Sequence, residues 1–156
     1  EPVLFDQGPG GEARPNPLAD GAERRRATFP DKASALAAYT GRGAFRSWKA
    51  EQLADYVEAG FRDAGDGQVT LACAPAWEAS NFRIHRYDPW AAFAATRCPI
   101  RMLRAAFDST ARIEDHAAEL TANPRLRIET VPGTTHFLPM ERPDLVRAAL
   151  EDLTRA

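Results

Sequence analysis

The chain has 156 residues, of which 44% are hydrophobic and 27% charged, and its formal net charge is −2. This apolar fraction is high enough to bury a core, which excludes an intrinsically disordered segment. No run approaches the roughly 18 apolar residues of a membrane span. The near-neutral charge argues against a nucleic-acid-binding surface. The local Arg24–Arg26 cluster is predicted to be the solvated face of a short helix.

The first residues predict the end of a buried strand followed by a loop. The chain begins at Glu1 without an initiator methionine and runs directly into the apolar stretch Val3-Leu4-Phe5. Glycine and proline then dominate residues 7–17, where neither helix nor strand can propagate. This abrupt start leads us to expect that the chain was cut from a longer protein.

Residues 31–96 are predicted to form mostly short helices, with little sheet. Asp31 is placed to cap a helix that runs through Tyr39. Ser47 is placed to cap a second helix, which Gly60 ends. The region therefore predicts a helical subdomain.

From residue 97 onward the pattern changes to alternating strands and helices. Strands are expected at 98–103 and 126–131, the first followed by a helix from Ser109 or Thr110 to about Ala122. A last amphipathic helix begins at Pro143. This order predicts parallel strands joined by right-handed crossovers, which is an α/β layer.

An acid and a histidine follow the two predicted strands. His136 lies in a loop opened by Pro132-Gly133, and Asp108 follows the preceding strand. At the carboxyl edge of a parallel sheet, an imidazole is a natural general base, and a carboxylate can hold its Nδ1 proton. The alternatives are a loop histidine that only packs, and an aspartate that caps the next helix, as Ser109 could do equally well.

These features resemble the C-terminal part of an α/β-hydrolase. The segment His-Phe-Leu-Pro-Met-Glu-Arg-Pro at 136–143 resembles the histidine loop of that family closely. The resemblance implies an α/β fold comprising the C-terminal part of a parallel sheet with an inserted helical cap. Residues 1–15 would end a core strand and lead into the cap, 16–96 would form the cap, and 97–156 the C-terminal core.

The resemblance also implies a catalytic role for the acid and the histidine. His136 would be the general base and then the general acid of a triad, oriented by Asp108, with Asp6 as an alternative acid. The expected reaction is hydrolysis of an ester or related acyl bond. Two alternatives stay open: an epoxide hydrolase or dehalogenase with an aspartate nucleophile, and an inactive truncated module that binds a partner.

The family's nucleophile elbow, Gly-x-Ser-x-Gly, is not found in this sequence. The four serines, Ser34, Ser47, Ser80 and Ser109, stand in helical or capping contexts. We therefore expect the nucleophile and the oxyanion-binding amides to lie in a complementary N-terminal half, and this chain to be inactive alone.

The remaining expectations concern ligands and location. The aromatic residues expected to contact an apolar acyl or alkyl substrate are Trp48, Trp77, Phe82 and Phe137. No cofactor is implied and no metal is expected, because His85–Asp88 and Asp115-His116 lack a recognised ligand spacing. Cys73 and Cys98 are expected to be reduced and largely buried, which favours a cytoplasmic protein. The charge balance and the absence of a long apolar run argue against nucleic-acid and membrane partners.

Overall fold

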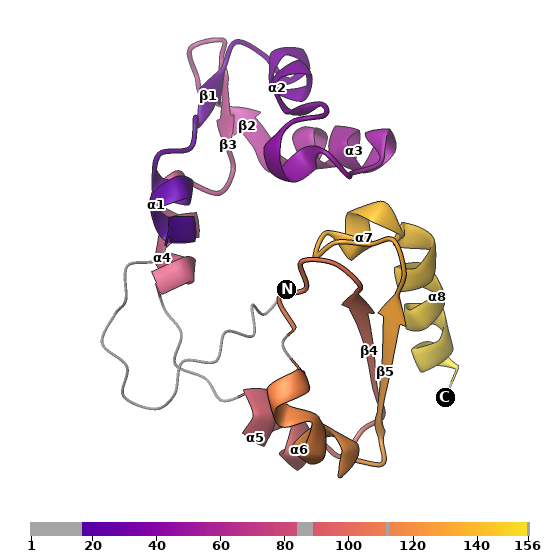
Figure 1. The fold of residues 1–156 in the computed structure, drawn as a ribbon. Helices are drawn as coiled ribbons and strands as arrows, with labels where there is room; N and C mark the ends of the chain where they lie inside the picture. Colours follow the sequence, from indigo (N-terminus) through magenta and orange to yellow (C-terminus); the bar gives the residue numbers. More distant parts are fainter. Residues whose placement is uncertain (1–16, 84–88, 112, 156) are drawn as a thin grey trace. The chain divides into compact units, whose positions relative to one another are not determined.

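The computed structural model describes residues 17–83, 89–111 and 113–155. The described residues form two compact units, one ending at Arg83 and the other starting at Pro89 (Figure 1). Each unit is treated by itself below. The strand expected at Val3–Phe5 and the alternative acid Asp6 lie outside the described residues.

The N-terminal unit combines short helices with a small antiparallel sheet. Its elements are α1 (Pro17–Glu23), β1 (Thr28–Phe29), α2 (Lys32–Tyr39), the 3₁₀ helix η1 (Gly43–Phe45), α3 (Ala50–Gly60), β2 (Phe61–Asp63), β3 (Val69–Leu71) and α4 (Pro75–Arg83). The strands pair in the order β1-β3-β2. The sequence predicts little sheet in this region, whereas the structure has these three short strands. Strands of two or three residues are too short to show an alternating pattern.

The two predicted helix starts in this unit had different outcomes. The backbone N–H of Ser34 donates to Asp31 Oδ1 at 2.6 Å, so Asp31 caps α2 as predicted and its pKa is lowered. The second helix begins at Ala50 rather than beside Ser47, because η1 and a turn occupy the preceding residues. Its end at Gly60 is confirmed.

Two clusters hold the N-terminal unit together. The larger one joins the sheet to α2 and α3 and consists of Phe29, Ala35, Val57, Phe61 and Leu71, all buried. In the smaller one, Ala19 and Ala22 of α1 contact Ala79 of α4, and Phe82 packs against them. Small side chains let these two short helices pack closely.

The C-terminal unit is an α/β layer built on two parallel strands. Its elements are α5 (Pro89–Ala95), β4 (Ile100–Ala105), the 3₁₀ helix η2 (Glu114–His116), α6 (Ala117–Thr121), β5 (Leu126–Val131), α7 (Leu138–Glu141) and α8 (Pro143–Thr154). Strands β4 and β5 pair in parallel from Ile100–Leu126 to Ala105–Val131. The expected parallel alternation is therefore confirmed.

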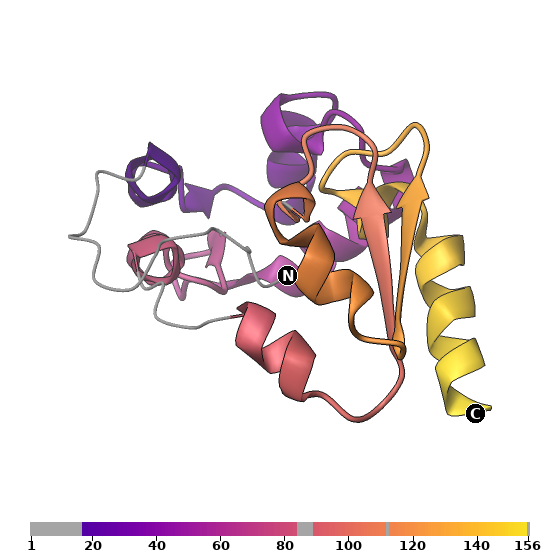
Figure 2. The ribbon, with the colours of Figure 1, turned by 60° about the horizontal axis from the view of Figure 1, so that its bottom comes forward.

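Helices cover both faces of this pair of strands. Figures 1 and 2 show α8 on one face and α5 with α6 on the other. Helix α5 packs against α6, and Asn123 Nδ2 donates to the carbonyl of Phe93 at 2.9 Å. The carboxyl ends of both strands are buried at Ala105 and Val131. The chain leaves both strands at a well-packed edge.

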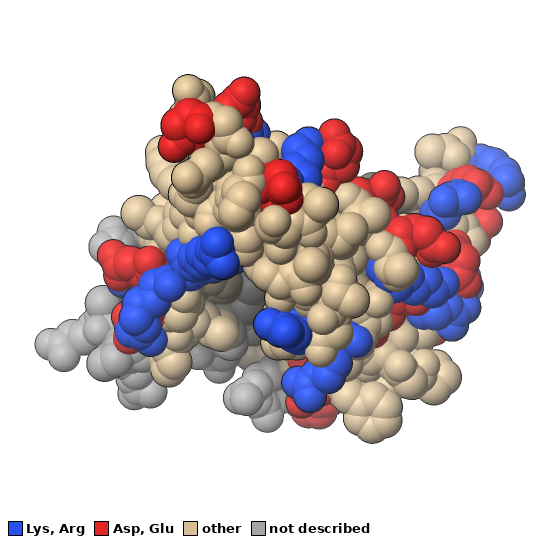
Figure 3. All heavy atoms as spheres, turned by 90° about the horizontal axis from the view of Figure 1, so that it is seen from above, with Lys and Arg blue, Asp and Glu red and all other residues tan. Residues whose placement is uncertain are grey.

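The remaining sequence expectations concern membrane spans, surface charge and the two cysteines. Within the described ranges, no helix is both long and apolar enough to cross a membrane. Many basic side chains lie beside acidic ones on the face shown in Figure 3. Cys73 and Cys98 are free, but both are exposed. The expectation of buried thiols was wrong because both residues lie in connecting segments rather than in packed elements.

Candidate active site

Two loops lie side by side at the carboxyl edge of the β4–β5 pair. The acid loop, residues 106–111, follows β4 and carries Asp108, and the histidine loop, residues 132–137, follows β5 and carries His136. The backbone N–H of Phe107 donates to the carbonyl of Thr134 at 3.0 Å, which joins the two loops. Phe107 precedes Asp108, and Thr134 is two residues before His136. Parallel strands end at the same edge, so the register of β4 and β5 brings the two loops together.

The histidine loop is ordered by a turn and by buried polar contacts. Gly133 has φ +72°, a conformation that glycine adopts without steric cost after Pro132. Thr134 is 2% exposed, and its hydroxyl donates to the carbonyl of Val131 at 2.8 Å. The half-buried His136 ring lies against Phe137, with ring centroids 3.9 Å apart and planes 39° apart.

The acid loop holds Asp108 in an unusual backbone conformation. Asp108 has φ +48°, and it is the one non-glycine residue with positive φ among those described. Aspartate is more tolerant of this region than most residues, yet such a conformation persists only where the surroundings impose it. The Asp108 side chain is exposed. Strained residues cluster at functional sites, which makes this position consistent with a site residue.

Arg104 holds the far side of the acid loop. Its Nε donates to the carbonyl of Ala111 at 3.2 Å, and its guanidinium pairs with Glu114. The backbone N–H of Glu114, and then the Arg104 charge, lower the pKa of the Glu114 carboxyl. The backbone N–H of Ala111 also donates to Ser109 Oγ at 3.2 Å. These contacts explain why the predicted helix does not begin at Ser109 or Thr110.

Asp108 does not cap the helix that follows β4. The first helical residue after β4 is Glu114, so Asp108, Ser109 and Thr110 lie too far upstream to cap that helix. The side chains of Asp108 and His136 do not form a hydrogen bond with each other, although their loops do. The pairing of the two as a catalytic couple stays a prediction.

An apolar groove adjoins His136. Its volume is about 260 Å³, and it runs between β4 and α8. Its lining includes His136 in the histidine loop, Leu138 and Pro139 of α7, Ser109 and Thr110 in the loop after β4, and Leu150 of α8. The imidazole thus faces a space with mainly apolar walls.

The four residues predicted to contact substrate lie in different surroundings. Trp48 packs edge-on against Phe45 and Tyr56 in the N-terminal unit, and Phe82 packs on the α1–α4 cluster. Trp77 is 71% exposed on α4. Phe137 is the one of the four that lies beside His136. A substrate role for each stays a prediction.

All four serines are described, and none stands at a turn from a strand directly into a helix. Ser34 and Ser80 lie within α2 and α4, Ser47 precedes α3, and Ser109 lies in the acid loop. Ser109 shares the groove with His136, but its Oγ is engaged by the Ala111 backbone.

Metal coordination finds no support in the part of the chain that is described. No group of three or more His, Cys, Asp or Glu side chains is placed there to hold an ion. The His116 ring stacks on Trp90, with centroids 3.9 Å apart and planes 17° apart. His85 and Asp88 lie outside the described residues.

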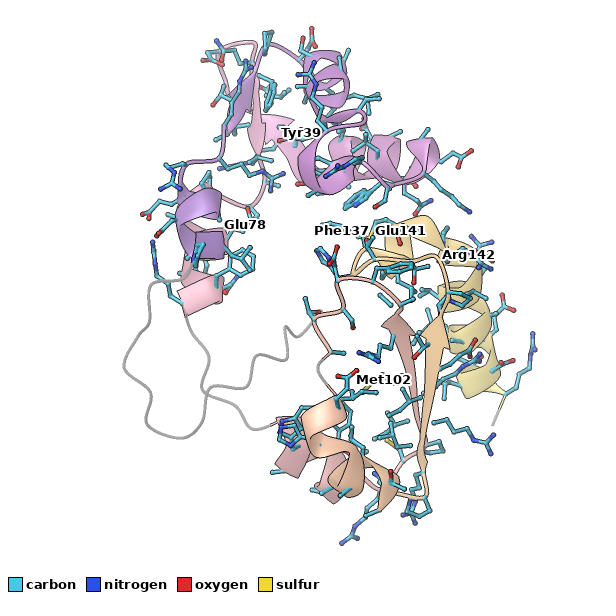
Figure 4. All side chains as sticks on the ribbon, in the orientation of Figure 1. Tyr39, Glu78, Met102, Phe137, Glu141 and Arg142 are labelled. Atoms are coloured by element: carbon cyan, nitrogen blue, oxygen red, sulfur yellow. The ribbon has the colours of Figure 1, made fainter. Side chains whose placement is uncertain are left out.

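Two residues of the site were not singled out from the sequence: Arg104 and Glu141. Glu141 accepts two hydrogen bonds from Thr135, directly beside His136. Figure 4 shows Glu141 on α7, close to Phe137. Its place five residues after the histidine was a usable signal, because a short helix there returns the carboxylate to the loop. No sequence signal pointed to Arg104, because alternating charged residues are common on strands.

Two parallel strands, the two loops that follow them and a closing helix form an α/β layer. Similarity to solved structures shows which fold this layer belongs to. The chain matches E-2-(acetamidomethylene)succinate hydrolase with a TM-score of 0.65 and 22% identity over 89% of the chain. It matches the peroxisomal alpha-beta-hydrolase Lpx1 from Saccharomyces cerevisiae with a TM-score of 0.69 and 15% identity over 97% of the chain.

The chain therefore has an α/β-hydrolase fold, and the predicted fold class is confirmed. It spans about half the length of these structures, covering 52% of the first and 45% of the second. No protein-family model matches the sequence. No curated protein matches it either.

Proposed function

We propose that this chain supplies the histidine and the acid of an α/β-hydrolase catalytic triad, acting on ester or related acyl bonds. The observation that carries the proposal is the hydrogen bond from Phe107 to Thr134, which sets the Asp108 and His136 loops side by side after adjacent parallel strands. The position of Asp108 at positive φ and the groove beside His136 add to it.

In this proposal His136 removes the proton from the nucleophile as it attacks the acyl carbon. Asp108 accepts a hydrogen bond from the Nδ1–H of the ring and stabilises the imidazolium that forms. The imidazolium then protonates the leaving alkoxide, and the ring next activates a water that releases the acid. The apolar walls around His136 would accommodate an acyl chain and limit the access of water.

The nucleophile belongs outside these 156 residues in this proposal. None of the four serines lies at a strand-to-helix elbow. Large apolar side chains are also exposed on the C-terminal unit, with Leu150 60%, Leu153 46% and Ile128 37% exposed. These residues would be covered by the complementary N-terminal half of the same fold, which brings the nucleophile and the oxyanion-binding amides. A cytoplasmic location fits the two free, exposed cysteines.

The test is turnover by the protein that carries this chain together with the nucleophile-bearing half. His136→Ala is expected to lower kcat for p-nitrophenyl esters by at least about 10³-fold, and Asp108→Asn by about 10²–10⁴-fold, with the fold retained. Retained turnover in His136→Ala refutes the assignment of the base, and retained turnover in Asp108→Asn refutes that of the acid. Turnover of a haloalkane or an epoxide in place of the ester would contradict the acyl substrate.

A further inference from the structure

Glu141 holds the backbone on both sides of His136. Its Oε2 accepts the backbone N–H of Thr135 at 2.8 Å, and its Oε1 accepts the hydroxyl of Thr135 at 2.7 Å. The same hydroxyl oxygen accepts the backbone N–H of Phe137 at 3.2 Å. The residues directly before and after the histidine are therefore fixed by a chain of hydrogen bonds that starts at one carboxylate.

Glu141 is the last residue of α7, and its two hydrogen bonds to Thr135 tie that helix to the loop that precedes it. Helix α7 is itself anchored, because Leu138 is 4% exposed and its N–H donates to the carbonyl of Thr135 at 2.9 Å. The loop from Thr135 to Glu141 is thus closed at both ends, with His136 inside it.

We propose that Glu141 is a positioning residue, which sets the orientation of the His136 ring towards the nucleophile. This inference rests on the proposed role of His136 as the base. The carboxylate does not reach the substrate; it acts by fixing the Thr135 and Phe137 backbone. Small displacements of a base relative to its proton donor have large effects on rate, so loss of these bonds lowers kcat rather than substrate binding.

The experiment compares Glu141→Ala, Glu141→Gln and the control Glu151→Ala in the protein that carries both halves of the fold. Glutamine retains an oxygen for the Thr135 N–H, and its amide can donate to the Thr135 hydroxyl. We expect Glu141→Ala to lower kcat by about 10–100-fold with little change in KM. We expect Glu141→Gln to retain most of the parent kcat. Glu151→Ala removes the same charge from an exposed position on α8 and leaves kcat unchanged.

Hydrogen exchange separates positioning from general destabilisation. In Glu141→Ala, amide exchange of residues 132–141 is expected to accelerate while that of β4 and β5 stays at the parent rate. Faster exchange throughout β4 and β5 overturns the inference, because Glu141 would then serve the whole unit. So does an equal loss of kcat in the alanine and glutamine variants.

The two proposals fail in distinguishable ways. If His136→Ala is inactive but Glu141→Ala retains the parent kcat, the positioning role is wrong and the triad assignment stands. If His136→Ala keeps its turnover, the proposed function is wrong, and the positioning role fails with it.

Discussion

Arg25 is the most heavily engaged charged side chain of the N-terminal unit. Its guanidinium bonds the hydroxyl of Tyr56 at 2.5 Å and the carboxylate of Glu78 at 3.1 Å, and it lies 5.6 Å from the ring centroid of Tyr39. Figure 4 labels Tyr39 and Glu78. Burial acts to lower the pKa of Arg25, but the interactions with Tyr56 and Tyr39 outweigh it and raise that pKa. For Tyr56 burial acts in the opposite direction and raises the pKa of the phenol.

The sequence could not have identified this role. Three consecutive arginines predict the solvated face of a short helix. Arg24 and Arg26 are exposed as predicted, but α1 ends at Glu23, so the helical part of that prediction was wrong. Arg25 was predicted wrongly, because its neighbours Tyr56 and Glu78 lie 31 and 53 positions further along the chain. A pattern read within a few residues holds no information on such contacts.

Replacing Arg25 with alanine should destabilise the chain by about 2 kcal/mol, because charged hydrogen bonds and ring contacts are lost from a half-buried site. The measurement is urea unfolding followed by tryptophan fluorescence. Arg24→Ala removes the same charge from an exposed neighbour and should change the free energy of unfolding by less than about 0.5 kcal/mol. Equal effects of the two substitutions would contradict the special role of Arg25.

At the scale of elements, the sequence predicted the long segments of the C-terminal unit well. Strand β5 was expected at 126–131 and is found there, and α8 begins at Pro143 as predicted. These elements have regular apolar patterns over six or more residues. The predictions were wrong where side-chain contacts determine the backbone conformation. In the acid loop, Arg104 and Ser109 bond the Ala111 backbone, and the helix predicted from Ser109 or Thr110 does not begin there.

The turn that begins the histidine loop provides a matched pair of glycine substitutions. Gly133→Ala should cost about 1–2 kcal/mol, because a Cβ is unfavourable at φ +72° although the space around it is open. Gly21 lies within helix α1, its φ is not in the positive region, and an added Cβ would meet nothing there within 4 Å. Gly21→Ala should therefore stabilise by up to about 1 kcal/mol. Thermal unfolding checks both, and a stabilising Gly133→Ala would contradict the strained turn.

At the scale of the whole molecule, the sequence predicted an α/β-hydrolase core from its acid, its histidine loop and the order of its strands. Comparison with solved structures confirms that fold, and the chain covers about half the length of each neighbour. The placement of Asp108 and His136 relative to a nucleophile could not be predicted, because the elbow is not found in these residues. The division of the chain at residue 96 stays a prediction.

The central claim is that this chain carries the base and the acid of a triad but not its nucleophile. The most direct measurement is p-nitrophenyl ester hydrolysis by the 156-residue chain alone, with His136→Ala beside it. We expect that neither protein releases p-nitrophenol faster than the uncatalysed reaction. Turnover by the parent chain that disappears in His136→Ala would contradict it, because the nucleophile would then lie within this sequence.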